Sequence, residues 1–530
     1  MTDQPSIEQV LGRNDGRDGD DDDSPTQSKP SQATVLVNLA IDAGAELFHS
    51  PDGVAYATLP IENRSENWPL RTKSVKRWLS RLYFASTEKA PGSQAVADAL
   101  GVLEGQALFD GDEHQVFTRV AGHAGAIYLD LADGDWRAVR ITATGHSVVS
   151  DPPVKFVRSR GMLPLPVPES GGSLDQLREF VNYGSEEDFR LIVSWLAMTL
   201  RPTGPYPVLA LYGEQGSGKS TMAEMLRSLV DPNQALLRPP PRDERDLMIA
   251  GNNSRIIGLE NLSTIQQWLS DALCRISTGS GFSARELYSD ADETIFSVQL
   301  PIVLNGIIDV VTKGDLQDRS VVLTLPRISG YVSEDDLWKR FESARPRLLG
   351  ALLDVVSGAM AAEEEVHIEE PPRMADFARW MVAAAPTMGW DPEELLDAYT
   401  NNRAAANETT LEASPLVGPL RRLGNFEGAA ADLLDQLGDI AGDGIARSKT
   451  WPKSPSALSG SLRRLAPNLR RSLPGIEIEF ERRADGRLIR VTQLDEVRET
   501  PSSASRPSWN DADDGDDAEL LTHSNAGVAQ

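Results

Sequence analysis

Four short runs of apolar residues lie in the middle of the chain, at residues 206–212, 255–260, 300–305 and 320–325. Runs that are apolar throughout and this short are typical of strands buried on both faces, as in parallel sheets. The residues that follow the first run, 221–230, have apolar residues at helical spacing and stop at an Asp-Pro pair. The pattern therefore predicts an α/β core with a parallel sheet over residues 174–330.

Helical spacing predominates in the sequence before and after the residues predicted to form this sheet. Residues 174–200 predict a helix that Pro and Gly end at 201–205, and residues 334–399 predict a helical segment that completes the core over residues 331–405.

The pattern is mixed before the core, over residues 34–165, which predicts an α+β accessory domain. A helix is expected at 74–82, strands at 114–120 and 125–131, and a hairpin turn at 133–136. Residues 163–172 are rich in Pro and Gly and predict a linker.

A second change of pattern marks the end of the chain. Helices are expected at 428–437 and 455–465, and residues 476–483 and 487–492 alternate as a β-hairpin does. From 447 to 490 there are eleven Lys or Arg residues and four Asp or Glu residues. Helices followed by a basic hairpin predict a winged-helix-like domain over 425–495, with DNA contacts at Arg463, Arg464, Arg482 and Arg483. A structural cap whose arginines offset acidic tails is the alternative.

Charge separates the ends from this basic segment. The 530 residues carry a net charge of −27, and clusters of aspartate lie near both ends, which predicts disordered acidic tails at 1–33 and 496–530. One cysteine, Cys274, excludes internal disulfides, and no apolar run reaches membrane length. The first residues are acidic and polar, unlike a signal peptide. We expect a soluble, cytoplasmic protein with no membrane partner.

A phosphate-binding loop follows the first apolar run, with the pattern G-x-x-x-x-G-K-[ST]. Glycines allow the backbone N–H groups to surround phosphate oxygens, Lys219 can reach the β- and γ-phosphates, and the Ser220 hydroxyl can bind Mg²⁺. The helix expected next directs its positive end at the phosphates. The expected ATP-binding residues are Gly213, Glu214, Gln215, Gly216, Ser217, Gly218, Lys219, Ser220 and Thr221.

The later apolar runs supply partners for this loop. Glu260 ends the second run, 41 residues after Lys219, where an acid can hold the Mg²⁺ shell or polarise water. Asn305 ends the third run, where an amide can bond the γ-phosphate and the attacking water. Arg319 precedes the fourth and could reach a neighbouring subunit's nucleotide, which predicts a ring. The alternatives are a solvated strand-end Glu260, a turn asparagine, and a surface Asp318–Arg319 pair.

Residues from about 174 to 400 resemble the superfamily-3 helicase ATPases and the related phage, plasmid and poxvirus primase-helicase ATPases, a branch of the AAA+ proteins. The match includes residues 276–288, which in that family lie near a DNA-contacting pore hairpin and which imply a DNA contact for Arg285. The resemblance implies a sensor role for Asn305 and a trans-acting role for Arg319. It departs at Glu260, where the family usually has aspartate. Residues from about 120 to 495 resemble ATP-binding proteins of actinobacterial mobile elements.

The sequence thus predicts an α/β, AAA+-like P-loop NTPase core with an α+β N-terminal accessory domain and a C-terminal winged-helix-like domain. We expect a DNA helicase or translocase of a phage-like or mobile-element replication system, dependent on ATP and Mg²⁺. A homo-oligomeric ring is expected, with a hexamer as one candidate size. Two rivals stay open: an AAA+ switch in which ATP binding only assembles a DNA-bound regulator, and a DNA-binding protein with a vestigial ATPase. Residues 34–165 lack the clustered acidic residues that a primase would need. The six histidines show no metal-ligand spacing.

Overall fold

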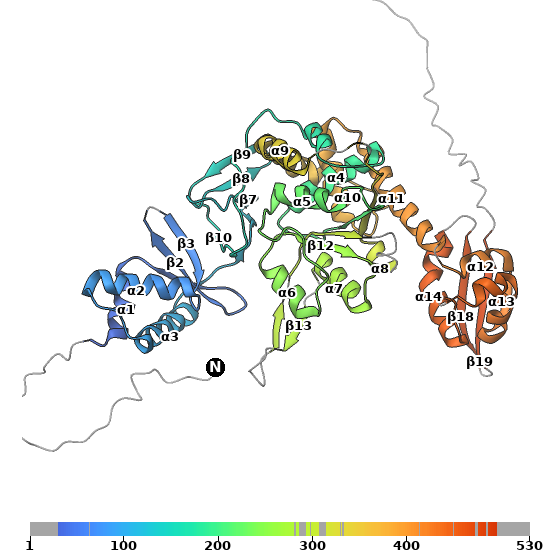
Figure 1. Cartoon of the computed structure of the whole chain (residues 1–530), viewed down its shortest axis with the longest axis horizontal. Coiled ribbons are helices and arrows are strands. Elements are labelled where there is room, and N and C mark those ends of the chain that lie inside the picture. The colour runs from blue at the N-terminus through green and yellow to red at the C-terminus, as the bar shows by residue number, and fades with distance from the viewer. Residues whose placement is uncertain are drawn as a thin grey trace, which may run out of the picture. The chain divides into compact units, whose positions relative to one another are not determined.

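Figure 1 shows the computed structural model, which describes residues 30–494 except 63, 280–281, 286–292, 297, 307–313, 329, 331–332, 413, 449, 472–474 and 484–485. The chain divides into two compact units, Met1–Thr410 and Leu411–Gln530. The two predicted acidic tails lie almost wholly outside the described residues. Helix α1 (Gln32–Asp42) already begins within the last residues assigned to the first tail, because the Ser31 hydroxyl caps it by accepting a hydrogen bond from the Thr34 N–H at 3.1 Å.

The first part of unit 1 is a small α/β arrangement with its own core. Helices α2 (Lys73–Thr87) and α3 (Ser93–Phe109) join α1 beside a sheet of order β3-β2-β1-β4. The predicted helix at 74–82 is confirmed, since Val75, Leu79 and Tyr83 recur at helical spacing and are buried. The strands are β1 (Glu46–His49), β2 (Ala55–Ile61), β3 (Arg64–Pro69) and β4 (Asp112–Glu113).

A second sheet follows, an antiparallel meander of order β6-β7-β8-β9. The turn predicted at 133–136 does join two of its strands. The strand predicted at 114–120 is wrong as one element, because Arg119 has a left-handed backbone (φ 68°) that divides β5 from β6. The strands are β5 (Val116–Phe117), which pairs with β10 (Lys155–Phe156), then β6 (Val120–His123), β7 (Ala126–Asp130), β8 (Ala138–Thr142) and β9 (Gly145–Val149).

This meander packs into the large core of unit 1, because Leu129, Val139 and Ile141 belong to the same buried cluster as residues of α4 (Glu186–Thr199) and α9 (Glu334–Ala362). The residues predicted as a linker are also packed. Leu165 is buried and its N–H donates to the Leu131 carbonyl at 2.8 Å, while the Leu163 N–H donates to the Pro232 carbonyl at 2.9 Å. The segment is therefore a fixed connection and not a flexible tether.

The central sheet of unit 1 is parallel, with order β12-β15-β11-β16. All four apolar runs form strands as predicted. On β11, Leu209 and Leu211 pack in one buried cluster, and Val208, Ala210 and Tyr212 in another, because successive side chains of a strand point to opposite faces. The strands are β11 (Val208–Tyr212), β12 (Ile257–Leu262), β15 (Ile302–Gly306) and β16 (Ser320–Thr324).

Helices cover both faces of this sheet. Helix α5 (Lys219–Val230) contributes to the same cluster as Leu209, while α6 (Glu244–Asn252) and α7 (Gln267–Thr278) contribute to the other. The predicted helix after the loop is confirmed and begins two residues early. The short helix α8 (Gly314–Gln317) precedes β16, and a hairpin of β13 (Phe282–Arg285) and β14 (Glu293–Phe296) follows α7.

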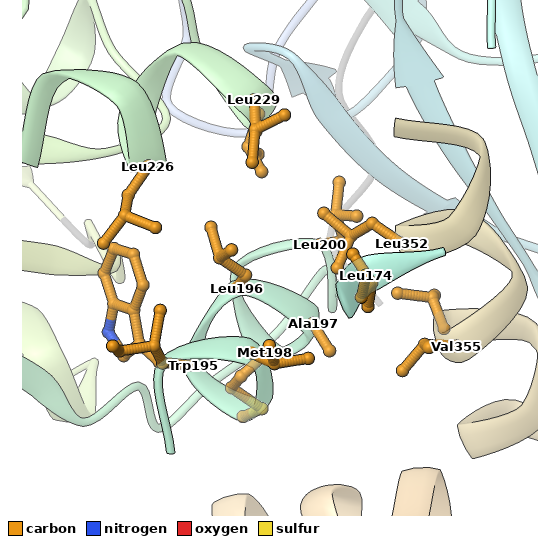
Figure 2. Close-up of a cluster of buried hydrophobic side chains, with 14 of the residues drawn as sticks. Leu174, Trp195, Leu196, Ala197, Met198, Leu200, Leu226, Leu229, Leu352 and Val355 are labelled. Carbon is orange, nitrogen blue, oxygen red and sulfur yellow. The ribbon is translucent and has the colours of Figure 1, made fainter. Parts of the chain in front are cut away.

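The helix predicted over 174–200 is wrong as one element. A 3-10 helix, η2 (Leu174–Glu179), and helix α4 (Glu186–Thr199) are separate, because the Ser185 hydroxyl accepts a hydrogen bond from the Asp188 N–H at 3.2 Å and starts α4 anew. In Figure 2, Trp195 and Leu196 of α4 lie toward Leu226 and Leu229 of α5, and Ala197 lies toward Leu352 and Val355 of the next long helix. Helix α4 is therefore buried between its neighbours.

The helical segment predicted after the sheet is confirmed. It consists of α9 (Glu334–Ala362), η3 (Glu363–Glu365), α10 (Ala375–Ala384), η4 (Ala385–Met388) and α11 (Pro392–Glu412).

Unit 2 has its own core and a three-stranded sheet of order β17-β19-β18. The predicted hairpin is confirmed, with Ile476 opposite Gln493 and Arg482 opposite Arg487. The helix predicted to start at 428 starts at Ala430, because the preceding residues pair with β19 as a strand that the sequence pattern did not predict. The elements are α12 (Val417–Leu423), β17 (Phe426–Ala429), α13 (Ala430–Ala446), α14 (Pro455–Arg471), β18 (Ile476–Arg483) and β19 (Gly486–Gln493).

Candidate nucleotide-binding site

The glycine-rich loop joins the carboxyl end of β11 to the amino end of α5, in the middle of the parallel sheet. Two of its glycines are required by the backbone. A Cβ on Gly213 would lie 2.7 Å from the Leu325 carbonyl oxygen, and Gly218 has φ 75° at the residue that precedes α5. The loop can therefore wind tightly around a ligand at the positive end of the helix.

Lys219, the first residue of α5, turns back over this loop. Its Nζ donates to the carbonyl oxygens of Gly213 and Glu214, each at 2.8 Å, and lies 3.3 Å from the Ser217 Oγ. Burial lowers the pKa of Lys219. All three of these contacts of the ammonium group are with atoms of the loop.

Asn305 connects the loop helix to the strand that ends in an acid. Its Nδ2 donates to the Ser220 Oγ at 3.2 Å, and its Oδ1 accepts a hydrogen bond from the Asn261 N–H at 2.8 Å. Asn305 is 2 % exposed. Because β15 lies between β11 and β12, one side chain at its end can reach both neighbours.

Glu260 lies at an irregularity of β12. The pairing of β12 with β15 shifts register between Leu259 and Leu262, and Asn261 has φ 55°. A bulge of this kind redirects the side chains beside it. Glu260 is half-buried, and its N–H donates to the Arg238 carbonyl at 2.9 Å.

Two residues of this region were not predicted from the sequence. Burial raises the pKa of Glu224 on α5, and the charges of Glu260 and Glu334 raise it further, so Glu224 adds a second acid near Glu260. Asn182 donates through Nδ2 to the Ser217 carbonyl at 2.9 Å and to the Pro326 carbonyl at 2.6 Å. The position of Glu224 four residues after Ser220, on one helix face, is a signal that could have indicated it; Asn182 lies in an irregular segment with no such signal.

Arg319 lies at the amino ends of the parallel strands, whereas the glycine-rich loop lies at their carboxyl ends. Its carbonyl accepts a hydrogen bond from the Val208 N–H, at the start of β11, whereas the loop follows the end of that strand. Five residues of strand separate the two levels, or about 17 Å. The guanidinium group forms an ion pair with Asp315 and donates to the Asp315 carbonyl at 2.8 Å. The structure therefore brings together Lys219, Ser220, Glu260 and Asn305, and does not bring Arg319 to them.

The residues predicted to contact DNA lie on two separate hairpins and one helix. The backbone of Arg285 lies in β13 and pairs with Glu293 of β14. In unit 2, Arg463 of α14 is exposed and its guanidinium lies 4.6 Å from the centre of the Phe480 ring, and Arg482 is exposed near the hairpin tip. The side chains of Arg285, Arg464 and Arg483 lie outside the described residues.

Within residues 30–494, apart from the gaps given above, no group of three or more His, Cys, Asp or Glu side chains is placed to hold a metal ion. None of the helices described there has both the length and the apolar character needed to cross a bilayer.

Comparison with known families supports a connection with mobile elements. Residues 174–408 match the family model described as Actinomycete integrative conjugative element replication protein. The chain is similar to replication proteins of mobile elements. Residues 413–506 match the model described as AICE RepA C-terminal domain. The predicted resemblance to proteins of actinobacterial mobile elements is confirmed at this level. No curated protein matches the chain.

Two solved structures match this chain over most of their lengths. The structure titled "SCCmec type IV Cch - active helicase" shares 10% identity at a TM-score of 0.46, over 85% of this chain and 92% of that one. The apo structure of the NrS-1 C terminal region shares 12% identity at a TM-score of 0.38, over 88% of this chain and 100% of that one. At such scores neither likeness decides what this chain does.

Proposed function

We propose that this protein is a Mg²⁺-dependent ATP hydrolase that acts as a DNA helicase or translocase in the replication of a mobile element. The observation that carries the proposal is the pair of hydrogen bonds from Asn305 to Ser220 and to Asn261. They join the loop helix and the acid-bearing strand at the carboxyl edge of the parallel sheet, where α/β folds bind ligands.

The residues present fit ATP and Mg²⁺. The loop holds glycine where a Cβ would collide at Gly213, and Lys219 Nζ bonds only to loop oxygens, which phosphate oxygens could replace. Backbone N–H groups of the loop, from Gly213 to Thr221, would hold the phosphates, with Lys219 on the β- and γ-phosphates. Ser220 and Glu260 would hold Mg²⁺, which would neutralise charge on the phosphates.

The remaining side chains of the site would position the attacking water and hold the loop in place. Asn305 is fixed on both sides, so its amide is available at one orientation for the attacking water and γ-phosphate. Glu260 would polarise that water. Asn182 would hold the loop in place through the Ser217 and Pro326 carbonyls. Preorganised donors of this kind stabilise charge as it develops.

Arg319 supports a ring. It lies about 17 Å from the loop of its own chain along β11, so its guanidinium would serve the site of an adjacent copy. The ring would be a homo-oligomer, and the ion pair with Asp315 would hold the Arg319 side chain, which is 16% exposed, in one position. We further propose that unit 2 is a winged-helix-like DNA-binding domain and that Arg285 contacts DNA in the ring pore. We also propose the domain boundaries predicted from the sequence and a cytoplasmic location.

The test is ATP turnover and strand separation by the full chain and by its Lys219→Ala variant. We expect the variant to lose hydrolysis and unwinding while its thermal unfolding midpoint stays the same. Lys339→Ala is the matched control, since Lys339 is 76% exposed on α9 and far from the loop in sequence. Near-normal turnover by Lys219→Ala would remove the loop from the mechanism. Turnover by the wild-type chain without unwinding would favour the ATP-switch alternative.

A further inference from the structure

A hollow of about 510 Å³ lies in unit 1, away from the glycine-rich loop. Most of its lining comes from the junction of β3 and α2, the residues after β10, and the end of α6, and Thr118, Asn233 and Arg238 complete it. The Ser159 hydroxyl donates across it to the Asn253 carbonyl at 2.9 Å, so two of these parts are held together. We call this hollow the basic groove, and its walls include Trp68, Lys73, Arg158, Arg160, Arg238 and Asn252.

The basic groove has an unusual charge for this chain. Four cations line it and no Asp or Glu does, although the chain as a whole carries a net charge of −27. Arg158 is neutralised by Asp130, to which it donates at 2.6 and 2.9 Å. Lys73, Arg160 and Arg238 have no acidic partner among the described residues. Uncompensated cations in a concave surface attract a polyanion strongly, because the low-dielectric walls concentrate the field.

Neutral groups in the basic groove suit phosphate and base recognition. The Thr72 Oγ1 is buried without a hydrogen-bond partner, and α2 begins beside it with no acid in its first turn. Ser74, Asn252 and Asn253 add polar groups, and Trp68 adds an aromatic surface. A basic channel with an aromatic wall is the usual way to bind a single strand without sequence preference.

The groove is connected directly to the candidate nucleotide site. The Arg238 N–H donates to the Gly258 carbonyl at 3.0 Å, and the Arg238 carbonyl accepts from the Glu260 N–H. Arg238 therefore belongs to a segment bonded to the strand that carries Glu260. A ligand bound at Arg238 and a nucleotide bound at Glu260 would therefore both be connected to strand β12.

We propose that the basic groove binds the sugar-phosphate backbone of single-stranded DNA. A single strand is favoured over a duplex because its unpaired bases can stack on Trp68, whereas the bases of a duplex are already stacked inside the double helix. The choice of DNA rests on the proposed function. The groove would form part of the strand's path and would be separate from the contacts proposed at Arg285 and in unit 2.

The test measures binding of a labelled single strand to the full chain, without nucleotide and at several salt concentrations. In the triple variant Lys73→Gln, Arg160→Gln, Arg238→Gln we expect affinity at low salt to fall on the order of tenfold. The slope of log affinity against log salt should decrease by about 2, since each phosphate contact to a single strand contributes about 0.7. The matched control removes three exposed cations of the same subdomain, as Arg77→Gln, Arg81→Gln, Lys89→Gln, and should bind as wild type.

Equal affinity and slope in the triple and control variants would overturn the proposal. Loss of duplex binding with unchanged single-strand binding would also overturn it and assign the groove to a duplex. If the triple variant unfolds early, Arg160→Gln alone decides, because Arg160 is exposed and its loss should still reduce the slope by about 0.7. Lys219→Ala should bind the strand normally. Persistent turnover in Lys219→Ala would contradict the ATPase proposal and leave the groove result intact.

Discussion

Asn305 donates a hydrogen bond to the Ser220 hydroxyl at 3.2 Å across the junction of β15 and α5. The same side chain accepts from the Asn261 N–H at 2.8 Å. Residues 85 positions apart are thereby connected, and the connection continues to the residue after Glu260. One buried amide therefore links Ser220 to the end of β12.

Removal of this amide should affect turnover more than stability. For Asn305→Ala we expect turnover to fall on the order of 10²- to 10³-fold, as when one preorganised donor is removed from an active site. The cost to folding should be about 1 kcal/mol, the usual net value of a hydrogen bond. Nucleotide affinity, measured by titration, should change little, since Asn305 bonds the Ser220 hydroxyl and none of the backbone N–H groups that would hold the phosphates.

The control for this substitution is Asn401→Ala, because Asn401 is exposed on α11 and lies outside the residues proposed for either site. It should keep normal turnover. A drop in nucleotide affinity equal to the drop in turnover for Asn305→Ala would instead indicate that Asn305 shapes the loop and has no role in the hydrolytic step.

Mixed subunits can test the proposed ring. Arg319→Ala and Glu260→Gln should each lose turnover while binding nucleotide. When the two are mixed, some interfaces combine an intact arginine from one copy with an intact acid from its neighbour, so part of the activity should return. Hydrolysis is measured across mixing ratios. No recovery at any ratio would show that Arg319 does not act on a neighbouring copy and would favour its simple ion pair with Asp315.

The sequence predicted the strands of the central sheet well for a physical reason. Each is apolar throughout because both of its faces are covered, and such runs differ sharply from the polar segments between them. The loop and Ser220 could be located because the loop follows such a strand and leads into α5, and Asn305 because it lies near the end of another. Once the strands are parallel, their carboxyl ends must meet at one edge.

The interruptions and the irregular contacts could not be predicted in this way. Residues 174–200 were predicted as one helix, but residues 180–185 are irregular and the cap formed by Ser185 starts α4 anew. Strand β17 is a short edge segment whose residues pair with residues of β19 that lie 59 to 65 positions later, from Ala429–Leu488 to Phe426–Val491. Asn182 bonds two backbone carbonyls from distant segments. These features depend on tertiary contacts, which a local pattern does not contain.

A buried carboxylate should be essential for the stability of unit 1. Asp231 is fully buried and accepts hydrogen bonds from the Arg255 and Ile256 N–H groups and from the Arg227 side chain, at 3.0 to 3.2 Å. The Arg119 Nε lies 3.5 Å from its other oxygen. Burial lowers the pKa of both arginines, and the charge of Asp231 opposes this.

For Asp231→Ala we therefore expect a loss of about 3–5 kcal/mol, because two buried guanidinium groups lose their counter-charge. Chemical denaturation of the full chain measures it. Asp135→Ala is the control, since Asp135 is 77% exposed and lies 3.7 Å from Arg137. Equal stabilities of the two variants would mean that water or the other carbonyls satisfy the arginines.

The cysteine should be unreactive while the protein is folded. Burial raises the pKa of Cys274 to about 12, compared with about 8.5 in an unfolded chain. The folded state therefore favours the thiol over the thiolate, which is the reactive form. Iodoacetamide at pH 8 should modify denatured protein quickly and native protein hardly at all, as measured by mass. The same shift means that the thiol contributes stability below pH 8.5 that is lost as the pH rises toward 12.

Unit 2 can be tested alone because it is compact and has its own hydrophobic core. The isolated residues 411–496 should bind duplex DNA weakly and with steep salt dependence. Arg463 and Arg482 are exposed cations on α14 and β18, and Arg463 lies against Phe480 of the hairpin, which joins the helix to the hairpin. Each phosphate neutralised releases counterions, so the log of affinity should fall with log salt by about 0.9 per contact.

Replacing Arg463 and Arg464 by Ala should lower the affinity and flatten the salt slope by nearly 2 if both contact phosphates. Replacing Arg482 and Arg483 should do the same with little effect on sequence preference, because hairpin contacts are mostly to the backbone. Arg490→Ala is the matched control, since Arg490 is already paired with Glu427 and Glu479. Titration of labelled duplex at several salt concentrations separates the cases. If affinity does not depend on salt, or none is detected in dilute buffer, unit 2 is a structural cap and its arginines serve to balance acidic residues of this chain.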